Sequence, residues 1–170
     1  SKSFPNERAI KYSDMIFEDG KSYMLLGASG CGKSTLLNMI AGILSPEEGE
    51  ILIGGENMVA KTQKEKDKFR INKIGYIFQD FKLIPEMTVI DIINILRLEG
   101  VDTSGADEFL EKLEMLDKKN KKVKNLSGGE RQRIILARAL ANNFNILIVD
   151  EGLNQVDTNM ERIILKNLFK

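Results

Sequence analysis

The chain has 170 residues, which is long enough for one domain with a substantial buried core. Lysine and arginine together number 25, as do aspartate and glutamate, so the formal net charge of zero gives no electrostatic support for nucleic-acid binding. A single cysteine excludes an internal disulfide framework, and no apolar run is long enough to cross a bilayer.

The N-terminal residues 1–21 are predicted to form an outer β arm with a turn at residues 18–21. Phe4 lies upstream of a glycine-rich stretch and could stack on an adenine base. A loosely packed terminal side chain explains Phe4 equally well, so both interpretations stay open. The apolar positions of the arm are Ile10, Tyr12, Ile16 and Phe17.

The glycine-rich stretch 27–35 has the sequence GASGCGKST, which matches the phosphate-loop pattern G-x-x-x-x-G-K-[ST]. The apolar run over residues 22–26 predicts a buried strand before it, and apolar residues at helical spacing follow it from Leu36 to Leu44. Strand, glycine loop and helix start together are the context of a phosphate site. The alternative, a glycine-rich turn before a core helix, is disfavoured because both flanking elements are predicted.

The residue types in this phosphate loop suit a nucleotide. Glycine lacks a Cβ, so the backbone at residues 27, 30 and 32 can adopt positive φ and turn its N–H groups toward an anion. The helix that begins near Lys33 adds its positive end, and Lys33 is expected to reach the β- and γ-phosphates. Ser34 is expected to ligate Mg²⁺ through its hydroxyl. The predicted nucleotide-binding residues of the loop are Gly27, Ser29, Gly30, Cys31, Gly32, Lys33, Ser34 and Thr35.

Strands and one exposed helix are predicted between the loop and residue 79. Residues 50–55 are expected to form a strand that leads into a turn, and the charged residues 62–70 an exposed helix. Residues 74–78 are apolar and β-prone, which predicts a buried strand that ends at Gln79. A glutamine at a strand end facing the phosphates could bind Mg²⁺ or the attacking water, although taken alone it is more often an ordinary turn residue.

The sequence becomes helical between residues 83 and 140, which we interpret as a helical subdomain inserted in the sheet domain. Thr88 and Ser104 are each expected to cap a helix there. The basic run over residues 118–124 is predicted to be a solvated loop.

The segment 126–132, with the sequence LSGGERQ, precedes another helical run of apolar residues. Ser127 is expected to cap this helix, and Gly128 and Gly129 leave its first N–H groups uncovered, so that a second positive helix start is open to an anion. A plain capping box between Ser127 and Glu130 is the alternative. That alternative accounts for the serine and the glutamate but not for the paired glycines.

The apolar residues 145–149 predict a last buried strand, which ends in Asp150 and Glu151. Asp150 at the carboxyl end of a central strand would hold Mg²⁺, directly or through water. Glu151 is the candidate base for an attacking water. An ordinary loop start is the alternative, and the preceding motifs disfavour it.

Together these motifs resemble the ATP-binding subunit of an ABC transporter. The phosphate loop, Gln79, the signature segment 126–132 and the strand with its acidic end occur in the family's order over nearly all of the chain. The resemblance implies an α/β fold of the P-loop NTPase (RecA-like) type, with a mainly parallel sheet, an antiparallel β arm and an inserted α-helical subdomain. It implies an ATP-binding core over residues 1–82 and 141–170 and a helical subdomain over residues 83–140.

The resemblance also implies a mechanism. Two subunits would close head to tail over two ATP molecules, each held with Mg²⁺ between the phosphate loop of one subunit and the signature segment of the other. Hydrolysis by water would reopen the pair. The residues carried over are Glu151 and Gln79 for catalysis; Ser34, Gln79 and Asp150 for Mg²⁺; and Phe4, Ser127, Gly128, Gly129 and Asp157 for the nucleotide.

The implied partners are a transmembrane permease subunit and a second ATPase subunit, either another copy of this chain or a related one, with no nucleic acid. Contact with the permease is expected near residues 79–87, on the cytoplasmic side of the cell membrane. Residues 74–85 and 87–89 resemble the branch of the family that exports lipoproteins, macrolides or antimicrobial peptides, so export is expected.

The chain departs from the family pattern at three points. Gly152 and Leu153 follow Glu151 where the family usually has proline, and residues 154–157 replace a Ser-Ala-Leu-Asp turn, of which Asp157 is kept. The chain contains no histidine, whereas the family places a switch histidine on a later strand. Little room precedes the arm for the family's first strand. We therefore expect a chain truncated at its C-terminus, with an open sheet edge that favours association or marginal stability.

Three other functions are weighed against transport. The absent histidine allows an ATP-binding module with little or no hydrolysis, in a regulatory or immunity role. A soluble family member acting on ribosomes or DNA is disfavoured, because neither paired cassettes nor long coiled-coil inserts are present. A small-molecule kinase is disfavoured because nothing in the sequence suggests an acceptor site.

Overall fold

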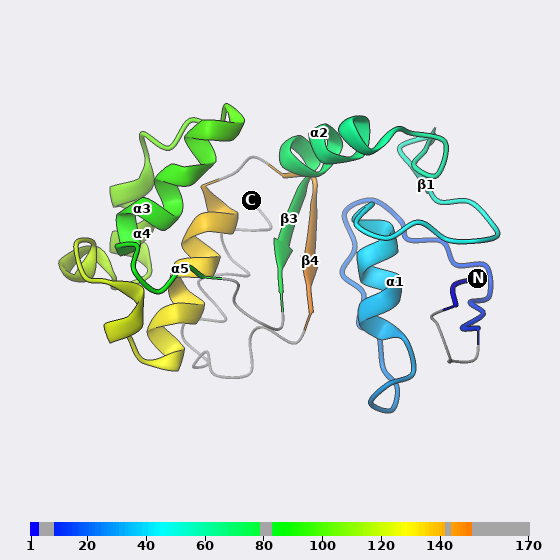
Figure 1. The fold of residues 1–170 in the computed structure, drawn as a ribbon, viewed down its shortest axis with the longest axis horizontal. Coiled ribbons are helices and arrows are strands. Elements are labelled where there is room, and N and C mark those ends of the chain that lie inside the picture. The colour runs from blue at the N-terminus through cyan, green and yellow to red at the C-terminus, as the bar shows by residue number, and fades with distance from the viewer. Residues whose placement is uncertain (4–8, 79–82, 142–143, 151–170) are drawn as a thin grey trace. The chain divides into compact units, whose positions relative to one another are not determined.

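A computed structural model describes residues 1–3, 9–78, 83–141 and 144–150 (Figure 1). The chain divides into two compact units, residues 1–70 and residues 71–170. This division does not test the predicted discontinuous core over residues 1–82 and 141–170 with a subdomain over residues 83–140, which stays a prediction. Among the described residues, no helix has the length and apolar character that crossing a membrane requires.

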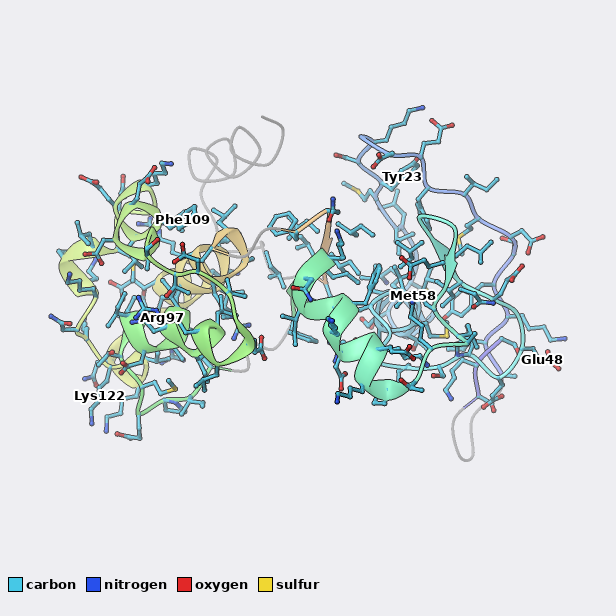
Figure 2. All side chains as sticks on the ribbon, turned by 90° about the horizontal axis from the view of Figure 1, so that it is seen from above. Tyr23, Glu48, Met58, Arg97, Phe109 and Lys122 are labelled. Atoms are coloured by element: carbon cyan, nitrogen blue, oxygen red, sulfur yellow. The ribbon has the colours of Figure 1, made fainter. Side chains whose placement is uncertain are left out.

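The first unit contains the helix predicted after the phosphate loop, α1 (Lys33–Ile40), and a short antiparallel hairpin of β1 (Leu52–Ile53) and β2 (Glu56–Asn57). Gly54 and Gly55 form its turn with φ of 57° and 81°, a left-handed backbone that glycine adopts without strain. The charged helix α2 (Gln63–Lys73) follows, close to the range predicted for it. Met58 lies in the interior of this unit, with 1% of its surface exposed (Figure 2).

The predicted buried strand over residues 22–26 is wrong. This segment has no regular secondary structure, and the side chains of Met24 and Leu26 are 81% and 84% exposed. A strand exists only when its N–H and C=O groups pair with a neighbour, and in the described part of the first unit β1 and β2 pair only with each other. The apolar residues therefore indicated a segment that is suited to burial, but they did not identify a strand with which it could pair.

The predicted β arm over residues 1–21 is confirmed only as a single antiparallel bridge between Lys2 and Ile10. Its later apolar residues are exposed, and Phe17 instead packs edge to face against Tyr23 at a ring-centroid distance of 5.0 Å. Tyr23 lies at the outer side of the unit (Figure 2). The predicted turn is confirmed at Asp19 and Gly20.

The second unit contains two parallel strands, β3 (Ile74–Ile77) and β4 (Ile146–Val149), as the two apolar runs predict. Their register pairs Ile74 with Ile146 and Ile77 with Val149, and the Asp150 N–H continues the ladder by donating to the Ile77 carbonyl at 2.9 Å. Parallel pairing brings the carboxyl ends of both strands to one edge.

Helices fill the chain between these strands, as predicted. They are α3 (Val89–Asn94), η1 (Ile95–Glu99), α4 (Ala106–Lys112), η2 (Leu116–Lys118), η3 (Val123–Asn125) and α5 (Gly128–Leu140). Helix α5 packs against α3, α4 and β3 (Figure 1). The core of the unit comprises Ile77, Val89, Ile92, Ile93, Ala106, Leu110, Leu113, Met115, Val123, Leu126, Ile134, Ile135, Leu136, Ala137 and Ala139.

One predicted helix cap is confirmed and one is wrong. Thr88 caps α3 through a capping box with Asp91. Ser104 does not cap α4, which begins after Gly105 without a side-chain cap. The backbone N–H and hydroxyl of Ser104 donate instead to the two carboxylate oxygens of Asp102, at 2.9 and 3.1 Å. This local turn competes with capping for the same groups.

Candidate functional site

The phosphate loop enters α1 through a left-handed turn. Gly30 and Gly32 have φ of 77° and 96°, as their lack of a Cβ permits. A Cβ on Gly32 would lie 2.7 Å from the Tyr12 hydroxyl and 3.0 Å from carbons of Ile10, so space as well as conformation requires glycine there. Gly27 does not adopt positive φ, contrary to expectation. A Cβ at Gly27 would instead lie 2.7 Å from the Cys31 sulfur.

The Lys33 ammonium lies against the carbonyl side of the same loop. It donates to the carbonyls of Gly27 at 2.9 Å and Ala28 at 3.0 Å, and it lies 4.0 Å from the Cys31 sulfur. An ammonium has three donors, of which two therefore meet good acceptors within the loop. Among the described residues the third meets only the long contact to sulfur, so the ammonium can donate to an incoming anion without leaving the loop.

Tyr12 supports the loop from outside, which sequence reasoning missed because Tyr12 was assigned only an apolar role in the β arm. Its hydroxyl donates to the Gly32 carbonyl at 2.8 Å. Burial raises the pKa of Tyr12, and a hydrogen bond with Thr35 opposes that rise. Thr35, predicted to bind nucleotide, thus contacts Tyr12, while Ser34 occupies the first turn of α1 beside Lys33. No sequence spacing signals this contact, because 20 residues separate Tyr12 from Gly32.

The signature segment forms the first turn of α5 in the second unit. The Ser127 oxygen accepts the Glu130 N–H at 3.3 Å, and the Glu130 carboxylate accepts the Ser127 N–H at 2.7 Å. The capping box considered as an alternative is therefore present. It occupies neither the Gly128 nor the Gly129 N–H, and no acceptor in the described part of the chain takes them. The box and two uncovered N–H groups at the helix start therefore coexist.

The basic run over residues 118–124 was predicted to be a solvated loop, and this is only partly right. The short helices η2 and η3 reach into the run at its two ends, and Val123 is buried in the core. Several of its lysines pair with acidic side chains. Lys118 lies 3.1 Å from the second oxygen of the Glu130 carboxylate. The hydrogen bond from the Ser127 N–H, and after it Lys118, lower the pKa of Glu130. Further along the run, Lys119 pairs with Asp107, and both Lys122 and Lys124 pair with Glu86.

Asp150 stands directly after β4, with 7% of its surface exposed. Its charge adds to the effect of burial in raising the pKa of Tyr76 on the neighbouring strand β3. The structure thus places the phosphate-loop residues together in the first unit, and the signature segment and Asp150 in the second. Phe4, Gln79, Glu151 and Asp157 lie outside the described residues, so their roles stay predictions.

A family model described as ABC transporter matches residues 10–154. An uncharacterized ABC transporter ATP-binding protein of Mycobacterium tuberculosis is 42% identical over 147 residues, covering 84% of this chain and 59% of the relative. The spermidine/putrescine import ATP-binding protein of Fusobacterium nucleatum is 36% identical over 173 residues, covering 99% of this chain and 44% of the relative. The chain thus spans about half the length of these relatives.

A solved structure gives the same result for the fold. The ATP-binding cassette MJ0796, solved as a dimer in a post-hydrolysis state bound to ADP and phosphate, aligns with a TM-score of 0.73 at 35% identity. The alignment covers 83% of this chain and 65% of that one. The predicted α/β fold of the P-loop NTPase type is confirmed by this likeness.

Proposed function

This chain belongs to the ABC transporter family, and we propose that it binds and hydrolyses ATP to power a transporter through head-to-tail dimerisation. The observation that carries the proposal is a pair of separate helix starts, each suited to an anion. Helix α1 begins at a left-handed glycine with an ammonium beside it, and α5 begins with two glycine N–H groups that its capping box leaves unused. In the proposed dimer, one ATP lies between α1 of one copy and α5 of the other.

The phosphate loop supplies the chemistry of binding. Lys33 neutralises charge on the β- and γ-phosphates, and the loop N–H groups donate to their oxygens. From the sequence pattern we assign Mg²⁺ to the Ser34 hydroxyl and the Asp150 carboxylate, because each is a hard oxygen ligand of the kind that Mg²⁺ prefers. Among the described residues no three acidic, histidine or cysteine side chains gather around one point, and Mg²⁺ bound to nucleotide needs no such cluster because phosphates and waters complete its shell. Bound there, Mg²⁺ would neutralise charge on the phosphates.

Hydrolysis requires an oriented water and a base. We assign Glu151 as the base and Gln79 as the residue that orients the water, with Asp157 and Phe4 as further nucleotide contacts. These four assignments rest on the sequence pattern. The dimer of the similar cassette with ADP and phosphate supports a hydrolytic cycle of this kind for this chain.

The membrane side of the proposal is a transmembrane permease that contacts the chain near residues 79–87 at the inner face of the membrane. The branch-like residues 74–85 and 87–89 favour export. Relatives named for import of spermidine, putrescine and methionine share 36% identity with this chain, so a transport assay must test both directions.

The test of the proposed function uses the full chain and Glu151→Gln. Wild type is expected to release phosphate from Mg·ATP at steady state. The variant is expected to lose that release while keeping tight ATP binding, because only the base is removed. Equal rates in the two proteins would overturn hydrolysis by this site and leave an ATP-binding module without turnover. A titration with Mg·ATP followed by light scattering measures dimerisation in the same samples.

A further inference from the structure

The lysine run over residues 118–124 contains one member whose partner lies in the signature segment. Lys119 pairs with Asp107, and Lys122 and Lys124 both pair with Glu86. Lys122 lies at the rim of the second unit in Figure 2. Lys118 instead reaches the Glu130 carboxylate of the α5 capping box, at 3.1 Å. The run is thus more than a solvated loop, because its first lysine contacts the proposed nucleotide site.

The capping box creates an electrostatic conflict at that site. Glu130 stabilises the first turn by accepting the Ser127 N–H at 2.7 Å. The same carboxylate places a negative charge at the first turn of α5, to which Gly128 and Gly129 belong and where the proposed function places a phosphate. A carboxylate at a helix start reduces the positive potential that attracts a second anion. Capping and phosphate binding therefore make opposite demands on Glu130.

The contacts of Glu130 resolve this conflict. One carboxylate oxygen accepts the Ser127 N–H, and the other faces the Lys118 ammonium. We propose that Lys118 is a positioning residue of the signature segment that holds Glu130 in the capping box and cancels its charge, so that α5 can receive the phosphate of ATP. The inference rests on the proposed function and adds a residue to the same site.

The backbone around Lys118 is well placed for this role. Its N–H donates to the carbonyl of Met115 at 3.0 Å, and its carbonyl accepts the Lys121 N–H at 2.8 Å. Met115 is fully buried in the core that α5 also joins. The turn that carries Lys118 and the helix that carries Glu130 are therefore fixed to one core. Asp117, with an oxygen 4.0 Å from the Lys118 nitrogen, is a more distant competitor for the ammonium.

If Lys118 only stabilised the fold, its removal would lower the melting temperature. The side chains of Lys118 and Glu130 are 30% and 21% exposed, and ion pairs near the surface contribute little to folding stability. Removing Lys118 should therefore leave the melting temperature nearly unchanged. Its loss should weaken ATP-driven dimerisation, because that is the step in which a phosphate meets α5. The binding of ATP to the phosphate loop of a single copy should not change.

The experiment compares Lys118→Met, Lys118→Arg, Glu130→Gln, the double variant Lys118→Met/Glu130→Gln and the matched control Lys119→Met, each also carrying Glu151→Gln to hold ATP. Light scattering measures the ATP concentration at half-dimerisation, and a fluorescent ATP analogue measures affinity in dilute monomer. Lys118→Met is expected to raise the half-dimerisation concentration by roughly tenfold, a loss of about 1.4 kcal/mol. Monomer affinity should stay the same, and Lys118→Arg and Lys119→Met should behave as the parent.

The double variant tests whether Lys118 acts by balancing the charge of Glu130. Glu130→Gln removes the charge that Lys118 balances, so the double variant is expected to recover most of the dimerisation lost in Lys118→Met. Added salt should narrow the difference between Lys118→Met and the parent, because it screens the exposed carboxylate. The inference is overturned if Lys118→Met matches Lys119→Met, or if the double variant stays as weak as Lys118→Met. If the parent does not dimerise with ATP at any concentration, the proposed function itself fails, and the inference with it.

Discussion

The starts of α1 and α5 are both rich in glycine, yet the two first turns are built in different ways. Helix α1 begins at Gly32 in the left-handed region with no side-chain cap, whereas α5 begins at Ser127 in an extended conformation with a complete capping box. The loop before α1 is supported by Tyr12, a residue far away in sequence. The α5 turn is held by Ser127 and Glu130, which belong to the turn itself. The first start thus depends on distant packing and the second on local hydrogen bonds.

The two helices also differ in how much of their surface is buried, and α1 is again the less firmly held. Of α1 only Met39 is buried, whereas α5 buries six residues against α3, α4 and β3. A helix anchored by many core contacts keeps its first turn in place when one surface contact is lost. We therefore expect changes around α1 to affect nucleotide binding more strongly than matched changes around α5.

The largest effect is expected for Lys33→Ala, which removes the ammonium at the start of α1. Loss of the charge that faces the β- and γ-phosphates should reduce ATP turnover by roughly a hundredfold or more, and abolish measurable Mg·ATP binding. Phosphate release and nucleotide titration measure both quantities. Lys64→Ala, at an exposed lysine of α2 in the same unit, is the control for net charge. Unchanged affinity and turnover in Lys33→Ala would contradict the site assignment.

A Gly32→Ala substitution tests the left-handed start directly. The new Cβ would meet the Tyr12 hydroxyl at 2.7 Å in a backbone with φ of 96°, so we expect a loss of about 1–3 kcal/mol in the free energy of unfolding. Gly128→Ala is the counterpart at α5, where φ is not positive, and it should change stability by less than about 1 kcal/mol. Thermal unfolding measures both. Equal losses in the two variants would remove the distinction between the two starts.

The Ser127→Ala substitution removes the local cap of α5. We expect a loss of about 1 kcal/mol in the free energy of unfolding, because the Glu130 N–H loses its acceptor. Ser104→Ala is the matched control, since Ser104 was predicted from sequence to cap α4 and does not. Urea unfolding of both proteins checks the difference. A larger loss for Ser104→Ala would contradict the assignment of the caps.

An effect of similar size, but on nucleotide binding, is expected for Tyr12→Phe, which removes one hydroxyl beside the phosphate loop. The lost hydrogen bond to the Gly32 carbonyl should cost about 0.5–1.5 kcal/mol, seen as weaker Mg·ATP binding in calorimetric titration. Tyr23→Phe, at an exposed tyrosine of the same unit, should leave the affinity unchanged. If the two variants bind alike, the loop does not depend on Tyr12.

The smallest effect concerns acid pH and α5. Its environment lowers the pKa of Glu130 in the folded chain, so the contribution of this carboxylate to stability is fully present above the ordinary glutamate pKa of about 4.3. The contribution is lost as pH falls through the lowered value, because the unfolded chain then takes up the proton first. Denaturant unfolding at several pH values from about 7 down to about 3 checks this. The free energy of unfolding should fall more steeply with decreasing pH for wild type than for Glu130→Gln.

The features that could be predicted from the sequence are those held by contacts between residues close together in the chain. The strands β3 and β4 and the caps at Thr88 and Ser127 were predicted, because apolar runs and short spacings record contacts among near neighbours. The full Ser127–Glu130 box was considered only as the alternative at that helix start, and it is present. The strand over residues 22–26 was predicted and is not formed, because an apolar run does not specify which strand it pairs with. The predicted Ser104 cap is also wrong, because the Ser104 N–H and hydroxyl donate to the Asp102 carboxylate two residues before it.

The sequence by itself was enough to predict a phosphate loop, a glycine pair at the start of α5 and an acidic end of the last strand, because each is a local pattern of residue types. Only the tertiary structure decided that Tyr12 supports Gly32, that Lys118 pairs with Glu130, and that β3 and β4 run parallel in one register. Such contacts depend on the path of the chain through space. Periodicity and spacing along the chain do not record that path, so long-range pairs emerge only once the core has formed.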